Sequence, residues 1–261
     1  MKRTVPPASG GLAAGLLFAL ALTPGTPWPA AAEAEDNCIA CHRDAKLLVT
    51  NRKLYDYYRN WQRSIHAQES VSCADCHGGN PEAATREESH RGVGGESSTS
   101  SAVNFANVPV TCGGCHGDVE EAYRESAHFE HLMKAEDGKQ GPNCVTCHDS
   151  MSTLTLDVTT VGQTCLHCHN DESGNHPEIP DEARMALGRF LSIERFRRYV
   201  VRRADSAETG LFLEGIDARR GDLSILWHTL DLERIDAETV GILDALREKR
   251  DEIRAVKKTD G

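Results

Sequence analysis

The feature that most constrains this chain is its cysteine pattern, because all ten cysteines fall into five Cys-x-x-Cys pairs. The residue after every second cysteine is a histidine, although histidine makes up only 12 of the 261 residues. Two thiols at this spacing suit the two vinyl groups of one porphyrin, and the adjacent imidazole can then bind the iron. The pattern therefore predicts five covalent attachment sites for haem c. They are Cys38, Cys41 and His42; Cys73, Cys76 and His77; Cys112, Cys115 and His116; Cys144, Cys147 and His148; and Cys165, Cys168 and His169.

Ten cysteines could also form disulfides or bind zinc in place of haem attachment. An exported chain could form five disulfides, and paired Cys-x-x-Cys units could bind zinc. Neither use predicts a histidine after each pair, and a four-cysteine zinc site takes pairs two at a time, so that one of five would remain. The sequence favours haem.

The N-terminus indicates where this chemistry takes place. Lys2 and Arg3 precede an apolar stretch over residues 11–22, and small residues follow up to Ala34. This order is typical of a secretory signal peptide over residues 1–32, cleaved after Ala32 or Ala34, with an uncleaved anchor as the alternative. We therefore expect a periplasmic or otherwise extracytoplasmic protein whose mature chain does not span the membrane.

The net charge bears on partners. The formal charge is −11, and cleavage of the signal peptide would remove two basic residues and no acidic one. An acidic surface disfavours nucleic acid and suits a basic patch on a redox partner. The expected partners are redox proteins, such as a membrane quinol-oxidising complex or a periplasmic reductase, and the oligomeric state is left open.

The mature chain divides into two parts, and the expected fold class is mainly α with extensive loops. Residues 33–180 hold every haem motif but few large apolar residues, so we expect the haems to form the packed interior of a pentahaem domain. Residues 181–261 hold no cysteine. Apolar periodicity there predicts helices over 181–203 and 236–257, with shorter helices over 211–230 broken at Gly215 and Gly221. These helices would form a bundle or hairpin, serving as a scaffold or else as a docking surface.

A weak internal repeat points to distal iron ligands. An aromatic segment followed by Ser-x-His precedes the second haem motif at His66 and the fourth at His128. Each histidine is expected to reach a haem other than the one attached just downstream. The remaining distal candidates, in order, are His90, His176 and His131.

Two further histidines are expected to have other roles. His167 lies between the cysteines of the fifth motif and is expected on the surface. His228 is expected to be a structural histidine of the C-terminal part, with a return onto a haem as the alternative. Met133, Met151 and Met185 are possible soft ligands, although seven histidines outside the motif positions suffice for five irons.

With these motifs, the chain resembles the periplasmic multihaem (pentahaem) c-type cytochromes over about residues 38–176. The resemblance implies haems stacked as a wire, with two axial histidines on most irons. His42, His77, His116, His148 and His169 would be the proximal ligands.

The leading functional hypothesis is a periplasmic electron carrier rather than an enzyme, relaying electrons between a respiratory donor and a terminal reductase or other carrier. One alternative is an oxidoreductase in which one open-coordinate haem acts on a small nitrogen or sulfur compound. Related reductases can mark such a haem with lysine, whereas all five motifs here end in histidine. The other alternative is an electron-conducting subunit of a larger complex or filament.

Overall fold

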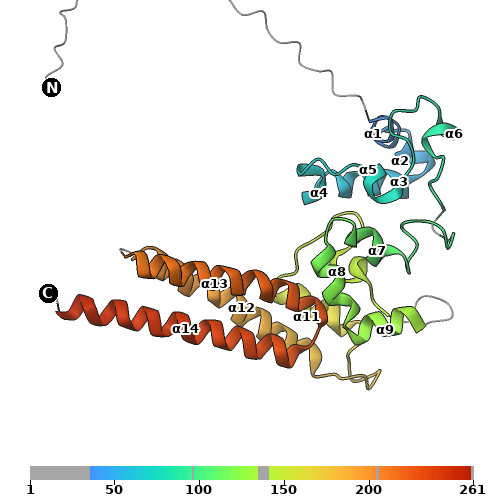
Figure 1. The fold of residues 1–261 in the computed structure, drawn as a ribbon. Helices are drawn as coiled ribbons and strands as arrows, with labels where there is room; N and C mark the ends of the chain where they lie inside the picture. The colour runs from blue at the N-terminus through green and yellow to red at the C-terminus, as the bar shows by residue number, and fades with distance from the viewer. Residues whose placement is uncertain (1–35, 96, 135–140, 204–205, 260–261) are drawn as a thin grey trace, which may run out of the picture. The chain divides into compact units, whose positions relative to one another are not determined.

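The chain is mainly helical, and no strand occurs among the residues that the structure describes (Figure 1). This computed structural model describes residues 36–95, 97–134, 141–203 and 206–259, which belong to one unit. The predicted signal peptide lies outside the described residues. The short helices are α1 (Asn37–His42), α2 (Leu47–Thr50), α3 (Arg52–Trp61), α4 (Ile65–Gln68), α5 (Cys73–His77), α6 (Arg86–Ser89), α7 (Val108–Gly113), α8 (Gly117–Arg124), α9 (Ala127–Lys134), α10 (Cys144–His148) and α11 (Val158–Leu166). The long helices are α12 (Ile179–Val201), α13 (Ala207–Leu226) and α14 (Leu232–Thr259), with a 3-10 turn η1 (Trp227–Thr229) between the last two.

Three of the five haem motifs begin short helices, and a polar residue just before the first cysteine explains why. The Asp36 carboxylate accepts from the backbone N–H groups of Cys38 and Ile39 at the start of α1. The Asn143 side chain does the same for the first turn of α10. Such caps satisfy the free N–H groups of a helix start, so each fixes where its motif begins to coil.

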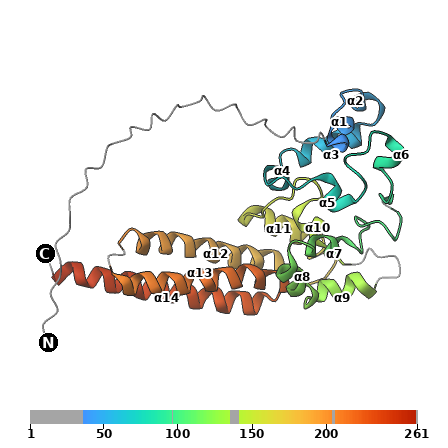
Figure 2. The ribbon, with the colours of Figure 1, turned by 45° about the horizontal axis from the view of Figure 1, so that its top comes forward.

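The C-terminal helices form a bundle with a seven-residue repeat of buried positions. Ala186, Ile193 and Val200 on α12 recur every seven residues, as do Ile216 and Leu223 on α13. Helices that bury residues at this period pack side by side along a shared seam, and α12, α13 and α14 lie side by side in both views (Figures 1 and 2). The α14 positions on the seam are Ile235, Ile242, Leu243 and Leu246.

The predicted helices over 181–203 and 236–257 correspond to α12, which begins and ends two residues earlier, and to α14, which extends beyond the prediction at both ends. The prediction for residues 211–230 was wrong, because α13 continues through Gly215 and Gly221 without a break. A Cβ atom at either glycine would meet nothing within 4 Å. Burial of Ile216 and Leu223 on the same helix outweighs the modest helix penalty of glycine.

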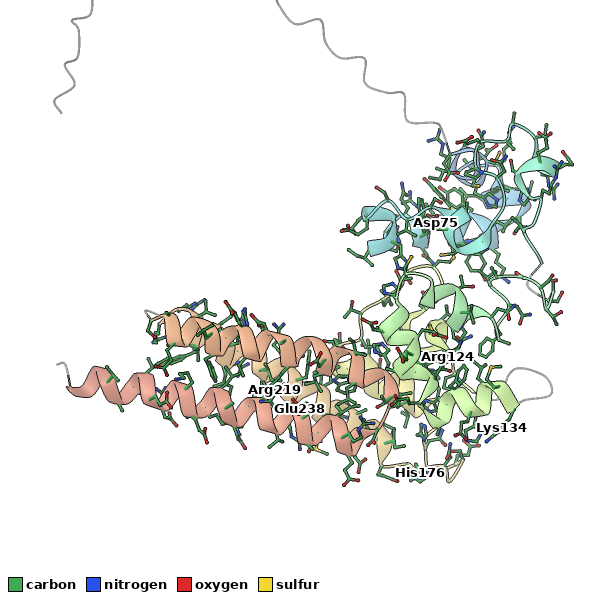
Figure 3. The ribbon with its side chains drawn as sticks, viewed as in Figure 1. Asp75, Arg124, Lys134, His176, Arg219 and Glu238 are labelled. Atoms are coloured by element: carbon green, nitrogen blue, oxygen red, sulfur yellow. The ribbon has the colours of Figure 1, made fainter. Side chains whose placement is uncertain are left out.

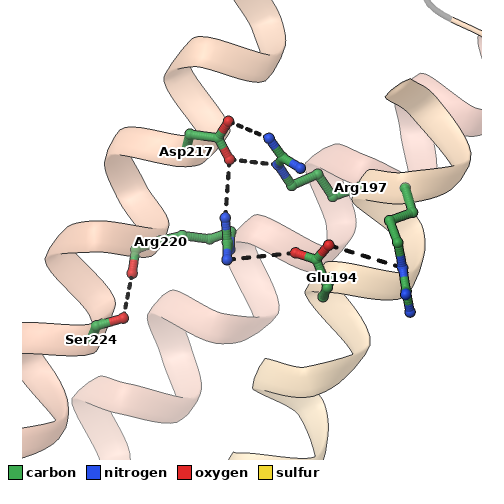
Figure 4. Close-up of polar contacts among 6 residues, drawn as sticks. Glu194, Arg197, Asp217, Arg220 and Ser224 are labelled. Atoms are coloured by element: carbon green, nitrogen blue, oxygen red, sulfur yellow. Dashed lines mark hydrogen bonds and ion pairs between the residues drawn. The ribbon is translucent and has the colours of Figure 1, made fainter. Parts of the chain in front are cut away.

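Ion pairs between helices surround the bundle core. Arg197 of α12 forms two hydrogen bonds to Asp217 of α13, at 2.5 and 2.6 Å (Figure 4). Arg219 of α13 reaches Glu238 of α14 at 2.8 Å (Figure 3). Arg189 of α12 pairs with Asp236 of α14. Each pair of neighbouring helices is therefore joined by a charged contact that specifies their register.

The N-terminal helices differ from this bundle in having no apolar core of their own. No residue of α1 to α6 is buried. Backbone hydrogen bonds and side-chain caps hold these helices.

The lengths and hydropathies of the described helices bear on membrane insertion. None of them is both long enough and apolar enough to cross a bilayer.

The continuous α13 predicts that replacing its glycines stabilises the bundle. Gly215→Ala and Gly221→Ala should each raise the free energy of unfolding by about 0.5–1 kcal/mol, because alanine loses less backbone entropy in a helix. Denaturant unfolding followed by far-UV circular dichroism measures this change. The control is Gly162→Ala in α11, where the new Cβ would lie 2.5 Å from Arg184 Cδ and 3.2 Å from the Pro180 carbonyl oxygen, so that stability should fall. A break in α13 would leave the first two variants without a gain.

The Arg197–Asp217 pair predicts a stability effect that depends on pH. Hydrogen bonding from Arg197, and then its charge, lowers the pKa of Asp217. A lowered folded pKa gives stability that is present above the unfolded pKa and is lost as the pH falls below about 4. Asp217→Asn should therefore cost about 0.2–1 kcal/mol at neutral pH, as for other partly exposed pairs.

The same unfolding measurement repeated at acid pH tests the direction of this effect. The difference between Asp217→Asn and the unchanged protein should shrink as the pH falls. Asp244→Asn serves as the matched control, because Asp244 pairs only within α14, with Arg247. Equal losses for both variants at every pH would contradict the assignment of a helix-joining role to Asp217.

Candidate functional site

The ten cysteines are free thiols, and neighbouring motifs in the chain are neighbours in space. Burial raises the pKa of Cys73 to about 12, and the charges of Asp36 and Cys38 in the first motif add to this effect. Burial likewise raises the pKa of Cys76, with a contribution from Cys112 of the third motif.

The row of motifs continues in the same way toward the C-terminus. Cys112 hydrogen-bonds Cys144 of the fourth motif, and this contact is the largest cause of the raised pKa of Cys112. Burial raises the pKa of Cys147 to about 11, helped by Cys165 and Cys168 of the fifth motif. The motifs therefore lie in space in the order in which they occur along the chain.

Four motif histidines each face a histidine from outside the motifs. The separations between ring centroids fall within a narrow range. They are 6.2 Å for His42 and His90, 6.1 Å for His66 and His116, 5.9 Å for His128 and His169, and 6.2 Å for His148 and His228.

This separation is compatible with a shared metal atom. Aromatic rings in ordinary contact also stand about 4.5–7 Å apart, so the fit to a metal rests on the repetition of nearly one value at four motif histidines. A metal–imidazole bond is about 2 Å long and the bonding nitrogen lies about 1 Å from its ring centroid, so two imidazoles across one metal atom stand about 6 Å apart. All four pairs match that value. In haem the porphyrin supplies the other four ligands, so one pair of histidines per iron is sufficient.

Hydrogen bonds to the backbone orient several of these rings. In His90, His148, His169 and His228 the ring Nδ1 lies 2.7–3.1 Å from a main-chain carbonyl oxygen. A carbonyl only accepts, so Nδ1 carries the proton and Nε2 keeps a free lone pair. This is the tautomer in which a histidine binds a metal through Nε2.

Buried polar atoms without partners gather at the same places. In the part of the chain that the structure describes, three buried side-chain atoms lack a hydrogen-bond partner: His128 Nδ1, Thr153 Oγ1 and Trp227 Nε1. Thr153 precedes the residue whose carbonyl accepts from His148, and Trp227 precedes His228. Unpaired buried polar atoms are rare in folded proteins. An iron and the propionates of a haem would supply partners of the kind that these atoms lack.

The repeated Ser-x-His segments have the same local structure. Ser64 and Ser126 each lie two or three residues after one helix and cap the next, accepting from the backbone N–H three residues on. His66 and His128 therefore occupy the second position of their new helices. His66 faces the third motif and His128 the fifth, so each passes over the motif that follows it directly in the sequence.

The structure does not bring two of the distal candidates opposite a motif histidine. His131 lies one turn beyond His128 on α9, and His176 is hydrogen-bonded to Glu178 in the loop before α12 (Figure 3). The cap at Ser126 fixes the start of α9, so that His128 is half-buried, whereas His131, three residues later, is exposed. His167 is exposed, and its Nδ1 contacts the carbonyl of Thr164.

His228, for which the sequence favoured a structural role, lies opposite the motif histidine His148. It belongs to η1, at the turn between α13 and α14, and its ring stacks at 27° to that of His148. Burial, and then the charge of His148, lowers its pKa. Its partner is 80 residues away, and no local pattern around Trp227 and His228 announces the contact.

His77 is the motif histidine that differs from the others. Among the described residues no histidine ring faces it. Burial lowers its pKa, with a smaller contribution from the charge of His42 in the neighbouring motif.

Comparison with known proteins adds no relative. The chain matches no protein-family model, no curated protein and no solved structure. Among the described residues there is also no group of three or more His, Cys, Asp or Glu side chains that could hold a metal ion. The chemistry of the chain is therefore inferred from the paired histidines and the cysteines beside them.

The cap at Ser126 predicts a loss of stability when its hydroxyl is removed. Ser126→Ala should lower the free energy of unfolding by about 1 kcal/mol, because it removes an N-cap and a buried hydroxyl that also donates to the Tyr123 carbonyl. The control is Ser192→Ala in α12, whose hydroxyl donates only to the carbonyl of Gly188 one turn back and should change stability little. Equal effects of the two variants in denaturant unfolding would contradict the capping role.

Proposed function

We propose that this protein is an electron-transfer protein that carries five covalently attached c-type haems. The observation that carries the proposal is the set of four histidine pairs with centroids 5.9–6.2 Å apart. Each pair joins one Cys-x-x-Cys-His histidine to a histidine from a distant segment, which is the arrangement that a six-coordinate haem requires.

The residues of the chain have distinct tasks in this proposal. The cysteine thiols would add across the haem vinyl groups to form thioether bonds, and the motif histidine would bind the iron. In four sites the facing histidine would bind the same iron. A bound haem iron supplies one-electron exchange between its ferric and ferrous forms. The main-chain carbonyl oxygens that accept hydrogen bonds from Nδ1 of His90, His148, His169 and His228 make these imidazoles stronger ligands.

The spatial order of the motifs supports a relay. Cysteines of the first motif lie near the second, and the same holds for each later neighbour along the chain. A row of sites in chain order has two ends, at the first and fifth motifs. We propose that electrons enter and leave the protein at these ends.

The compartment and the partners follow from the sequence. The signal-like N-terminus supports a periplasmic protein, and covalent haem attachment fits that compartment. The excess of 40 acidic over 29 basic residues supports docking to basic redox proteins, among them a membrane quinol-oxidising complex or a periplasmic reductase. The same charge opposes nucleic-acid binding.

The proposal predicts the mass and the spectra of the purified holoprotein. Intact-mass measurement should show five added haem groups that survive denaturation. In electron paramagnetic resonance, His128→Ala should convert one low-spin haem to a high-spin haem without loss of haem mass, because only its facing imidazole is removed.

A neighbouring residue on the same helix gives the matched control. His131→Ala should leave the spectrum unchanged, because His131 faces no motif histidine. A mass that contains cystines or zinc and no porphyrin would refute the proposed function. An unchanged spectrum in His128→Ala, with a changed one in His131→Ala, would refute the pairing.

A further inference from the structure

We propose that the second haem site, attached at Cys73 and Cys76 with His77 as its ligand, is open on its distal side and binds a small exogenous ligand. The class of ligand is a small neutral or anionic molecule that binds haem iron, such as carbon monoxide on the reduced protein or cyanide on the oxidised protein. This inference rests on the proposed haem attachment and names one site among the five.

The first step is a complete account of the histidines. All twelve lie in the described residues. Eight of them form the four facing pairs. The four that remain are His77 itself, His131, His167 and His176.

The second step is that the three spare histidines lie beside the fifth motif. His167 is part of that motif. His131 is close enough to His128, the partner of His169, to affect its pKa. His176 follows Asn175, whose carbonyl accepts from His169. None of the three is therefore placed to serve the second motif.

The third step concerns His90, which has the best opportunity to reach His77. The backbone N–H of Asn80 donates to the Ser89 carbonyl at 3.0 Å, which ties the turn after His77 to the segment that carries His90. Gly79, at φ +91°, packs so closely there that a Cβ would lie 2.5 Å from the same carbonyl oxygen. Although its segment is held beside the second motif, the ring of His90 faces His42. The Nδ1 of His90 is also committed, to the Arg86 carbonyl.

Methionine is the next soft ligand to consider. Met133, Met151 and Met185 lie on α9, in the loop after α10 and on α12. Helix α5, which carries His77, packs on α1, whereas α9 packs on α8 and α12 packs on α11, α13 and α14. Met133 and Met185 therefore belong to elements that pack with other partners, and Met151 follows α10, which packs on α7 and α11.

The position of the open site in the row gives it a distinct role. Cys73 lies near Cys38 of the first motif, and Cys76 lies near Cys112 and Cys115 of the third. The second site is thus internal to the row, with a histidine-paired site on each side. A ligand at this position would respond to the redox state of both neighbours.

Ligand binding to the full-length holoprotein tests the inference. After intact-mass measurement has established five haems, the oxidised protein should show one high-spin and four low-spin haems by electron paramagnetic resonance. The reduced protein should bind one carbon monoxide per chain in an optical titration. Cys73→Ala with Cys76→Ala should leave four haems and abolish both the high-spin signal and carbon monoxide binding.

A positive control opens a neighbouring site. His90→Ala should raise the stoichiometry from one carbon monoxide to two, because it removes the imidazole that faces His42. Five low-spin haems and no carbon monoxide binding in the unchanged protein would overturn the inference while leaving the proposed function intact. Carbon monoxide binding that persists in the double cysteine variant would overturn the assignment to the second site. Absence of haem from the mass would instead refute the proposed function.

Discussion

One spacing recurs through the structure, the distance of about 6 Å between the rings of four pairs of facing histidines. The facing histidine is supplied by α4, α9, η1 and a loop, and each ring is separated by many residues from its partner. One of these segments, α4, belongs to the N-terminal helices α1 to α6, which bury no residue. The relative positions of the four segments are consistent with a prosthetic group between the two rings of each pair. In this view the cofactors act as the core, and the polypeptide forms its shell.

The C-terminal bundle follows different physics. Its seam of buried aliphatic side chains at seven-residue spacing holds three helices together, and pairs such as Arg197–Asp217 fix their alignment. Removal of a buried side chain from this seam is costly, as in other tightly packed cores. Under the proposed function the chain therefore combines a part held by haem ligands with a part held by hydrophobic burial, and α11 packing on α12 joins them.

The sequence carried much of this information. Apolar periodicity predicted α12 and α14, and the Cys-x-x-Cys-His pattern needs only local spacing to be recognised. Prediction from the sequence failed where the outcome depends on distant contacts. Gly215 and Gly221 predict breaks by propensity, but burial of neighbouring side chains on α13 overrides them.

The distal candidates separate along the same line. His66 and His128 follow a capping serine by two residues, a signal that His131 and His176 lack, and this signal placed the first two ahead of the others in the sequence analysis. No such signal marks His228, because its pairing with His148 is created by the turn between two long helices. Likewise, the lack of a ring opposite His77 becomes apparent only when every other histidine has been placed.

The pairing of His148 with His228 has a consequence for biogenesis. His148 emerges from the ribosome 80 residues before its partner, and all five attachment motifs precede residue 228 in the chain. Under the proposed function, maturation enzymes can attach every porphyrin before the fourth iron receives its second imidazole. That site then reaches its final ligation only when α13 has coiled and the bundle has closed. A chain truncated before His228 would carry all five cofactors, but the fourth iron would lack its facing histidine. The ligation of the fourth iron would therefore report whether the C-terminus has folded.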